Sequence, residues 1–256
     1  MDLTQNLIMR YELLFPDQLR EAIKKNTPVV LPLGVLEYHG SHLVNGVDTL
    51  VVVRALELLE KEQDLIILPP FYYGASSYAV EPPEQNGSVH IEPQILNPFA
   101  KALFDNLLRI GFRNIHVFVH HQSENFTAGM PTDLSFKLAA RQSTFAFLEK
   151  ERGEGWWGRA DSADYYESHS QGDNPFNWIR IHPFLSSEIQ QTHPIDHAGK
   201  LETALMMALC PEGADMSRFT NDKWYTQTAK EATLAYGNEV KEAVMNNLRE
   251  ILFPAT

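Results

Sequence analysis

The chain has 256 residues, of which 44% are hydrophobic and 21% are charged, so it is long enough to bury a substantial core. Its formal net charge of -12 gives no electrostatic support for binding the phosphates of nucleic acid, and we expect no nucleic acid partner. The first residues lack a basic start followed by an apolar run, and no stretch reaches the ~20 apolar residues that cross a bilayer. With one cysteine there is no internal disulfide. We therefore expect a cytoplasmic protein with no membrane partner that acts on small molecules.

Apolar runs and helical spacings alternate along the first half of the chain. Residues 28–33, 64–68 and 114–119 are short apolar runs typical of buried parallel strands. Helical spacing of apolar residues lies between them, at 49–61 and 97–111. This alternation predicts a parallel sheet with helices packed on it.

The pattern is fainter in the second half. It predicts a helix near 134–141, a strand at 144–148, and helices near 201–209 and 229–253. Between 153 and 194 the periodicity fails while aromatic residues and histidines accumulate. Two interpretations of this segment stay open: a loop packed on its own aromatic side chains, or a lid or subunit contact near an active site.

Polar side chains gather after the first predicted strand. Open α/β sheets place ligand sites beyond the carboxyl ends of their strands, so the loops after Leu33 and Val119 are the first candidates. Glu37 and His39 are two residues apart and can face one point, and the glycines that follow allow Asp48 to return to it. Carboxylate and imidazole ligands suit zinc or manganese, and an aspartate can bridge two ions. The spacing is compatible with a metal site, although solvated polar loop residues would give the same pattern.

Four groups of short motifs occur in order along nearly the whole chain. They are Glu37-x-His39-Gly40-x-His42-Leu43 with Gly46-x-Asp48-Thr49, then Leu68-Pro69-Pro70-x-x-Tyr73-Gly74, Gly87-Ser88-Val89-His90-Ile91, and Asp196-His197-Ala198-Gly199 with Glu202-Thr203. Together they resemble the creatininase (creatinine amidohydrolase) family. The resemblance implies an α/β fold with three α/β/α layers around a mainly parallel sheet, in one metallohydrolase domain over residues 1–256. It also implies one or two divalent ions per chain, Zn²⁺ and/or Mn²⁺ with Fe²⁺ as a further option, bound by Glu37, His39 and Asp48.

The loop after the third predicted strand departs from the family pattern. It reads His120-His121-Gln122-Ser123-Glu124-Asn125. An alignment without a gap matches Glu124 and Asn125 to the Glu-Asn pair of creatininase, which makes Glu124 a metal ligand by resemblance, but it puts Gln122 where the family has a ligand histidine. A glutamine offers only a neutral amide oxygen, which is a weaker donor to zinc than imidazole. Either Gln122 is a weak ligand, or a shift by one residue brings in His121.

The remaining candidates come from the last motif and from other histidines. By resemblance, Glu202 is a second metal ligand or an active-site carboxylate, although a carboxylate at a helix start is common without either role. By resemblance, His197 protonates the leaving nitrogen and Asp196 orients it. His42 and His90 are candidates for support of the ligands or contact with substrate.

The expected substrate is a small cyclic molecule. Creatininase surrounds its substrate with tryptophans, and Trp157 and Trp178 are the candidates here. His193 stands, by its spacing from His197, where creatininase has a tryptophan, so a more polar pocket and poor use of creatinine are expected. We expect a hydrolase that opens a small cyclic amide by metal-activated water. The alternatives are a ring-opening C–C hydrolase on a cyclic diketone derived from a polyol such as an oxidised inositol, and a non-catalytic metal-binding scaffold. The resemblance further implies a homo-oligomer, a hexamer.

Overall fold

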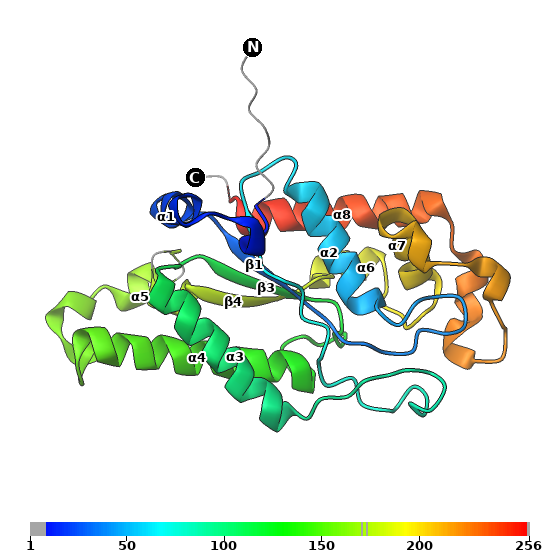
Figure 1. The fold of residues 1–256 in the computed structure, drawn as a ribbon, viewed down its shortest axis with the longest axis horizontal. Coiled ribbons are helices and arrows are strands. Elements are labelled where there is room, and N and C mark those ends of the chain that lie inside the picture. Colours follow the sequence, from blue (N-terminus) through cyan, green and yellow to red (C-terminus); the bar gives the residue numbers. More distant parts are fainter. Residues whose placement is uncertain (1–8, 170, 173, 255–256) are drawn as a thin grey trace, which may run out of the picture.

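A computed structural model describes residues 9–254 apart from 170 and 173. Its centre is a sheet of four parallel strands in the order β2-β1-β3-β4 (Figure 1). The strands are β1 (Val29–Leu33), β2 (Ile66–Ile67), β3 (Ile115–Val119) and β4 (Ile179–Pro183). The register places Val29 beside Ile66 on one side and Ile115 on the other, and Ile115 beside Ile179. The expected parallel sheet is confirmed.

Helices cover both faces of this sheet. The α-helices are α1 (Pro16–Lys24), α2 (Val47–Leu59), α3 (Pro93–Ile110), α4 (Pro131–Arg152), α5 (Tyr165–Ser168), α6 (Ser187–Thr192), α7 (Lys200–Leu209) and α8 (Leu234–Leu252). Short 3-10 turns lie at Tyr11–Leu13, Trp156–Gly158, Ala160–Ser162, Pro175–Asn177, Pro211–Gly213, Met216–Arg218 and Trp224–Glu231. One apolar core joins the sheet to α2, α6, α7 and α8, and a second joins it to α1, α3 and α4 (Figure 1). The predicted three-layer α/β/α fold is therefore confirmed.

Side chains of the two central strands, β1 and β3, contribute to both apolar cores. Val30 of β1 and Phe118 of β3 point to the core under α2 and α8, while Val29 and Val117 point to the core under α3 and α4. All four side chains are fully buried, because neighbouring strands and helices on both faces exclude water from β1 and β3. Each such side chain contributes about 1.5–3 kcal/mol through the burial of its apolar surface.

Two predictions for the second half of the chain were wrong. Residues 144–148 lie inside the continuous helix α4, because its buried residues recur at helical spacing and pack against α3. The Thr144 hydroxyl bonds back to the carbonyl oxygen of Ala140, as threonine does within a helix. The other error is β4, which lies in the segment 153–194 where no strand was predicted. It is an edge strand and only half buried, which explains its weak apolar signal.

Two helices begin at residues other than those expected. Helix α3 starts at Pro93 rather than near Asn97. Proline is favoured at the first position of a helix because an amide hydrogen there would have no acceptor within the helix. Helix α8 starts at Leu234, after Thr233 caps it by accepting a hydrogen bond from the amide of Tyr236. Of the described helices, none is both long and apolar enough to span a bilayer. The expectation drawn from the first residues concerns positions 1–8, which lie outside the described part of the chain.

The order of the strands determines where a ligand site can form. From β1 the chain continues to β2 on one side, and β3 then pairs with β1 on its other side. The loops that leave the carboxyl ends of β1 and β3 therefore diverge, which opens a crevice between them in sheets of this type. The loops after Leu33 and Val119, which the sequence indicated as first candidates, border this crevice, and side chains from both face one another across it.

Candidate metal centre

Carboxylates and imidazoles converge at this edge of the sheet in three overlapping groups. The groups are Glu37, Asp48 and His121; His39, Asp48 and Glu202; and Glu37, His39 and His197, and the ligand atoms within each group lie within 4.8 Å of one another. Except for His197, all of these side chains are buried. Six polar side chains from three separate parts of the chain thus face one small volume.

Asp48 belongs to two of the groups and sits in the first turn of α2. One carboxylate oxygen lies 3.5 Å from Nε2 of His39, and the other lies 3.4 Å from Nδ1 of His121. Gly34, directly after β1, allows this helix start to come so close, since a Cβ there would lie 2.4 Å from the Thr49 hydroxyl. One oxygen of Asp48 therefore faces His39 and the other faces His121, so each oxygen belongs to a different ligand group.

His39 has a ring orientation fixed by its own loop. Its Nδ1 lies 2.9 Å from the carbonyl oxygen of Glu37, which can only accept, so Nδ1 is the donor and Nε2 faces Asp48 and Glu202. Burial disfavours a charged ring here, but the nearby carboxylates of Asp48 and Glu202 override it and raise the pKa of His39 to about 10. The carboxylates around this ring therefore favour a positive charge at its position, either a proton on the ring or a bound cation.

His121 lies in the cluster, whereas Gln122 does not. Nδ1 of His121 lies 3.4 Å from carboxylate oxygens of both Glu37 and Asp48, and these charges raise its pKa to about 10 against the effect of burial. The Gln122 amide instead bonds in both directions to the backbone of Leu185, donating to its oxygen at 2.8 Å and accepting from its nitrogen at 2.9 Å. The arrangement favours His121 over Gln122. Glu124 is exposed and belongs to none of the three groups found among the described residues.

Glu202 reaches the cluster from the first turn of α7. Its Oε2 accepts a 2.6 Å hydrogen bond from the amide of Ala198, whose φ of 51° is uncommon for a residue other than glycine. Asp196 caps the same helix by accepting from the amides of Leu201 and Glu202 at 2.7 and 3.2 Å. Burial opposes ionisation of Glu202, but His39 and His120 outweigh it and lower its pKa to about 2. The strained loop and the cap hold one carboxylate in place.

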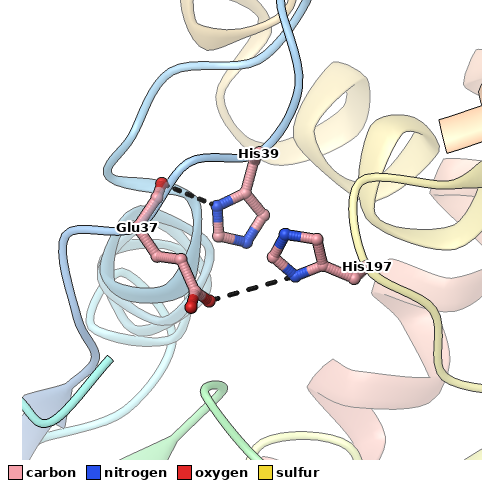
Figure 2. A group of neighbouring side chains, drawn as sticks. All are labelled: Glu37, His39 and His197. Carbon is pink, nitrogen blue, oxygen red and sulfur yellow. Dashed lines mark hydrogen bonds and ion pairs between the residues drawn. The ribbon is translucent and has the colours of Figure 1, made fainter. Parts of the chain in front are cut away.

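His197 lies on the open side of the cluster, with 26% of its side chain exposed. Its Nε2 donates to the carbonyl oxygen of Tyr38 at 2.9 Å, which leaves Nδ1 facing Glu37 at 3.9 Å (Figure 2). Its ring lies beside that of His39, with centroids 4.4 Å apart. The backbone of Tyr38 thus orients His197, which is the role predicted for Asp196; the structure gives Asp196 a helix cap instead.

His120 is a buried member of the site that the sequence analysis did not select. Its Nε2 lies 3.1 Å from Oε1 of Glu202, and its ring packs edge-on against Phe184. The signal was the histidine doublet directly after β3, of which only the second member was considered.

The other predicted histidines belong to none of the ligand groups found among the described residues. His42 is buried, with Nε2 3.0 Å from the hydroxyl of Thr203, and so links the first loop to α7. Nδ1 of His90 accepts from the amide of Ser77. His193 lies 3.3 Å from the hydroxyl of Tyr236. These contacts are supportive and structural.

The two predicted tryptophans lie away from the centre. Trp178 directly precedes β4, at the amino end of a strand whose carboxyl end faces the site, and Arg113 stacks on its ring at 4.6 Å. Trp157 packs with Tyr165 and Tyr166 of α5, a helix that lies beyond the same amino edge (Figure 1). Within one chain, the structure does not bring either ring to the ligand groups.

The chemistry of these donors fits divalent ions. Nε2 of His39, Oδ2 of Asp48 and Nε2 of His121 are buried and have no hydrogen-bond partner within the described part of the chain. Unsatisfied buried polar atoms are costly, and three buried carboxylates in one volume need compensating positive charge. Imidazole nitrogen and carboxylate oxygen are the ligands that zinc and manganese take. A buried mixed centre of this kind, at the carboxyl edge of a parallel sheet, is typical of metal-dependent hydrolases.

Comparison with known proteins gives the family. The family model described as "Creatininase: Creatinine amidohydrolase" matches residues 13–250, and the chain belongs to this family. The "Creatinine amidohydrolase" of Pseudomonas putida is 24% identical over 195 residues, which cover 74% of this chain and 67% of that protein. The "3-dehydro-scyllo-inosose hydrolase" of Thermotoga maritima is 22% identical over 222 residues, which cover 86% of this chain and 60% of that protein.

A solved structure gives the same fold. The structure named "Creatininase Mn" superposes with a TM-score of 0.66 at 18% identity, covering 96% of this chain and 99% of that one. The predicted family, fold and hydrolase class are confirmed, whereas the ligand roles of individual residues stay predictions.

Proposed function

We propose that the protein opens a small cyclic amide by hydrolysis at the centre around Asp48. The observation that carries this proposal is the pair of ligand groups that share Asp48, each with a histidine and a second carboxylate. We assign one ion to Glu37, Asp48 and His121, and a second to His39, Asp48 and Glu202. Divalent ions held there would lower the pKa of bound water and polarise a carbonyl oxygen.

The protein's own residues handle orientation and protons. The carbonyl oxygens of Glu37 and Tyr38 hold the rings of His39 and His197 in the required tautomers. Nδ1 of His197 lies on the open side of the cluster without a hydrogen on the neutral ring, so it can take a proton from the attacking water and pass it to the leaving nitrogen. Burial of the remaining ligands keeps bulk water from competing for the site.

A second candidate is hydrolysis of a carbon–carbon bond in a cyclic diketone. The relative named 3-dehydro-scyllo-inosose hydrolase aligns with 86% of this chain, which supports a hydroxylated ring as substrate. The same residues would serve, with His197 delivering its proton to the leaving carbon. Creatinine itself is expected to be a poor substrate, since the two predicted tryptophans are remote from the cluster.

The metals are proposed to be manganese or zinc. Structures similar in fold include the "Creatininase Mn" form and a "Zn-Zn type" mutant of creatininase. A cytoplasmic location, a single domain and a hexameric assembly are carried forward as proposals from the family resemblance.

The test begins with elemental analysis of protein purified without added metal, followed by assays of the manganese-loaded and zinc-loaded forms. The substrates are creatinine, other cyclic amides and hydroxylated cyclic ketones. We expect up to two ions per chain and hydrolysis that ceases when chelator removes them. A protein that holds well under one ion per chain and hydrolyses none of these rings would be the non-catalytic scaffold.

A further inference from the structure

The open side of the metal centre is bordered by a small polar cluster that the proposed chemistry does not use. His197 is the most exposed residue of the three ligand groups, and the ring of Tyr225 packs edge-on against it with centroids 5.4 Å apart. The hydroxyl of Tyr225 donates to Glu81 at 3.3 Å, and Nζ of Lys223 pairs with the same carboxylate oxygen at 2.5 Å. We call Glu81, Lys223 and Tyr225 the rim.

The rim joins two segments that are distant in the chain. Glu81 belongs to the long excursion between β2 and α3, and Lys223 and Tyr225 belong to the segment before α8. Both lie toward the carboxyl edge of the sheet (Figure 1). Tyr38, whose carbonyl oxygen holds His197, has its own hydroxyl near the same charges: burial and the carboxylates of Asp222 and Glu81 raise its pKa.

The rim presents hydrogen-bond donors and acceptors side by side at a place that water reaches. The side chains of Lys223 and Glu81 are 32% and 16% exposed. Lys223 can donate further hydrogen bonds, and Glu81 and the oxygen of Tyr225 can accept them. With two carboxylates, Glu81 and Asp222, against one ammonium, the cluster repels an anionic ligand.

Neighbouring hydroxyl groups match this set best, because each hydroxyl donates and accepts at once. One hydroxyl can donate to Glu81 while the next accepts from Lys223. The rings of Tyr225 and the 83% exposed Trp224, which pack edge-on at 5.8 Å, offer apolar surface for the carbon face of a ring. A carboxylate or phosphate would meet net negative charge instead.

We propose that the rim is a binding subsite for adjacent hydroxyl groups on a neutral ring, and that it sets the substrate class of the metal centre beside it. This inference rests on the proposed function, because it makes the rim a part of the same substrate site. In this proposal Tyr225 contacts the substrate directly. Glu81 and Lys223 also contact the substrate, and Glu81 holds Tyr225 and Lys223 in place.

The experiment is calorimetric titration of manganese-loaded protein with scyllo-inositol, a fully hydroxylated ring, and with cyclohexanol as the hydroxyl-poor probe. We expect scyllo-inositol to bind and cyclohexanol to bind at least about tenfold more weakly. Tyr225→Phe and Glu81→Gln should each weaken scyllo-inositol binding about 2- to 10-fold, the effect of one lost hydrogen bond. Tyr166→Phe, in α5 beyond the amino edge of the sheet, should bind like the wild type.

Tyr225→Phe keeps the ring that packs on His197, so it tests the hydroxyl even if Glu81→Gln fails to fold. Equal binding of the two probes, or wild-type affinity in Tyr225→Phe, overturns the proposal. The outcome is separable from that of the proposed function. Ring hydrolysis that is indifferent to hydroxyl groups removes the subsite alone, whereas rim-dependent binding of scyllo-inositol without any ring hydrolysis removes the hydrolytic proposal alone.

Discussion

The ring of His39 donates its Nδ1 hydrogen to the carbonyl oxygen of Glu37, two residues earlier, at 2.9 Å. Glu37 therefore has two roles. Its carboxylate belongs to two ligand groups, and its carbonyl oxygen fixes the tautomer of His39. His197 has the same arrangement with Tyr38. In both cases a backbone oxygen of the first loop, rather than a side chain, orients an imidazole.

Asp48→Asn should remove both ions, because Asp48 is the only residue common to the two groups assigned to metal. Glu37→Gln and Glu202→Gln should each leave about half the wild-type metal content, since each belongs to one of the two assigned sites. Elemental analysis after gel filtration measures this. The exposed Asp17→Asn is the matched control and should keep wild-type content. Full metal content in Asp48→Asn would show that the centre is elsewhere.

His121→Ala and Gln122→Ala should have opposite effects. The first removes a donor that faces Glu37 and Asp48, so zinc affinity and hydrolysis should fall while the fold persists. The second breaks two hydrogen bonds to Leu185, so the free energy of unfolding should fall by about 1–3 kcal/mol while zinc affinity changes little. Zinc titration at fixed pH and thermal unfolding separate the two. The reverse pattern would assign the metal to Gln122.

Metal affinity should rise with pH. Carboxylates raise the pKa values of His39 and His121 to about 10 from an ordinary 6.5, so metal must displace protons from these rings. A raised pKa in the folded state stabilises the metal-free protein below about pH 6.5, and this contribution is lost as pH rises through about 10. Unfolding temperatures measured with chelator and with manganese should therefore diverge as pH increases between these values. Curves that stay parallel would contradict the assignment of these histidines.

Asp196→Asn and Asp196→Ala distinguish a helix cap from a charge that acts on His197. Asparagine keeps one of the two acceptor oxygens, so Asp196→Asn should lose one of the two cap hydrogen bonds, be less destabilised than Asp196→Ala, and keep hydrolysis. Asp196→Ala should cost about 0.5–2 kcal/mol and impair the placement of Glu202, whose amide Asp196 holds. Burial and the charge of Glu202 also raise the pKa of Asp196 to about 6, so a neutral side chain is a mild change there. Loss of turnover in Asp196→Asn, with a smaller loss of stability than in Asp196→Ala, would restore the orienting role.

The fold could be predicted from the sequence where the burial of an element matches the spacing of its apolar residues. The central strands are apolar on both faces because both faces are covered, and they were recognised for that reason. The strand predicted at 144–148 failed because Thr144 and Leu148 lie on the buried side of one long helix that packs on α3, while Phe145 is exposed. Strand β4 had a recognisable signal, since Ile179 and Ile181 alternate with Arg180 and His182, the pattern of a half-buried edge.

The same omission explains the misplaced tryptophans. Had residues 179–183 been recognised as a parallel strand, Trp178 would have been placed at its amino end, opposite the site. Glu37, His39 and Asp48 could be predicted because they are close in sequence. Choosing His121 over Gln122 needed the position of Leu185, and His120 needed the position of Glu202, and spacing alone contains neither.

The donors of the centre are synthesised at very different times. Glu37, Asp48 and His121 all belong to the first half of the chain and leave the ribosome well before α7, whereas the group of His39, Asp48 and Glu202 is incomplete until α7 has emerged. A growing chain thus contains all three proposed ligands of the first ion well before Glu202, a proposed ligand of the second, has been made. In the proposed assignment, the first position can therefore be completed during synthesis while the second still lacks Glu202.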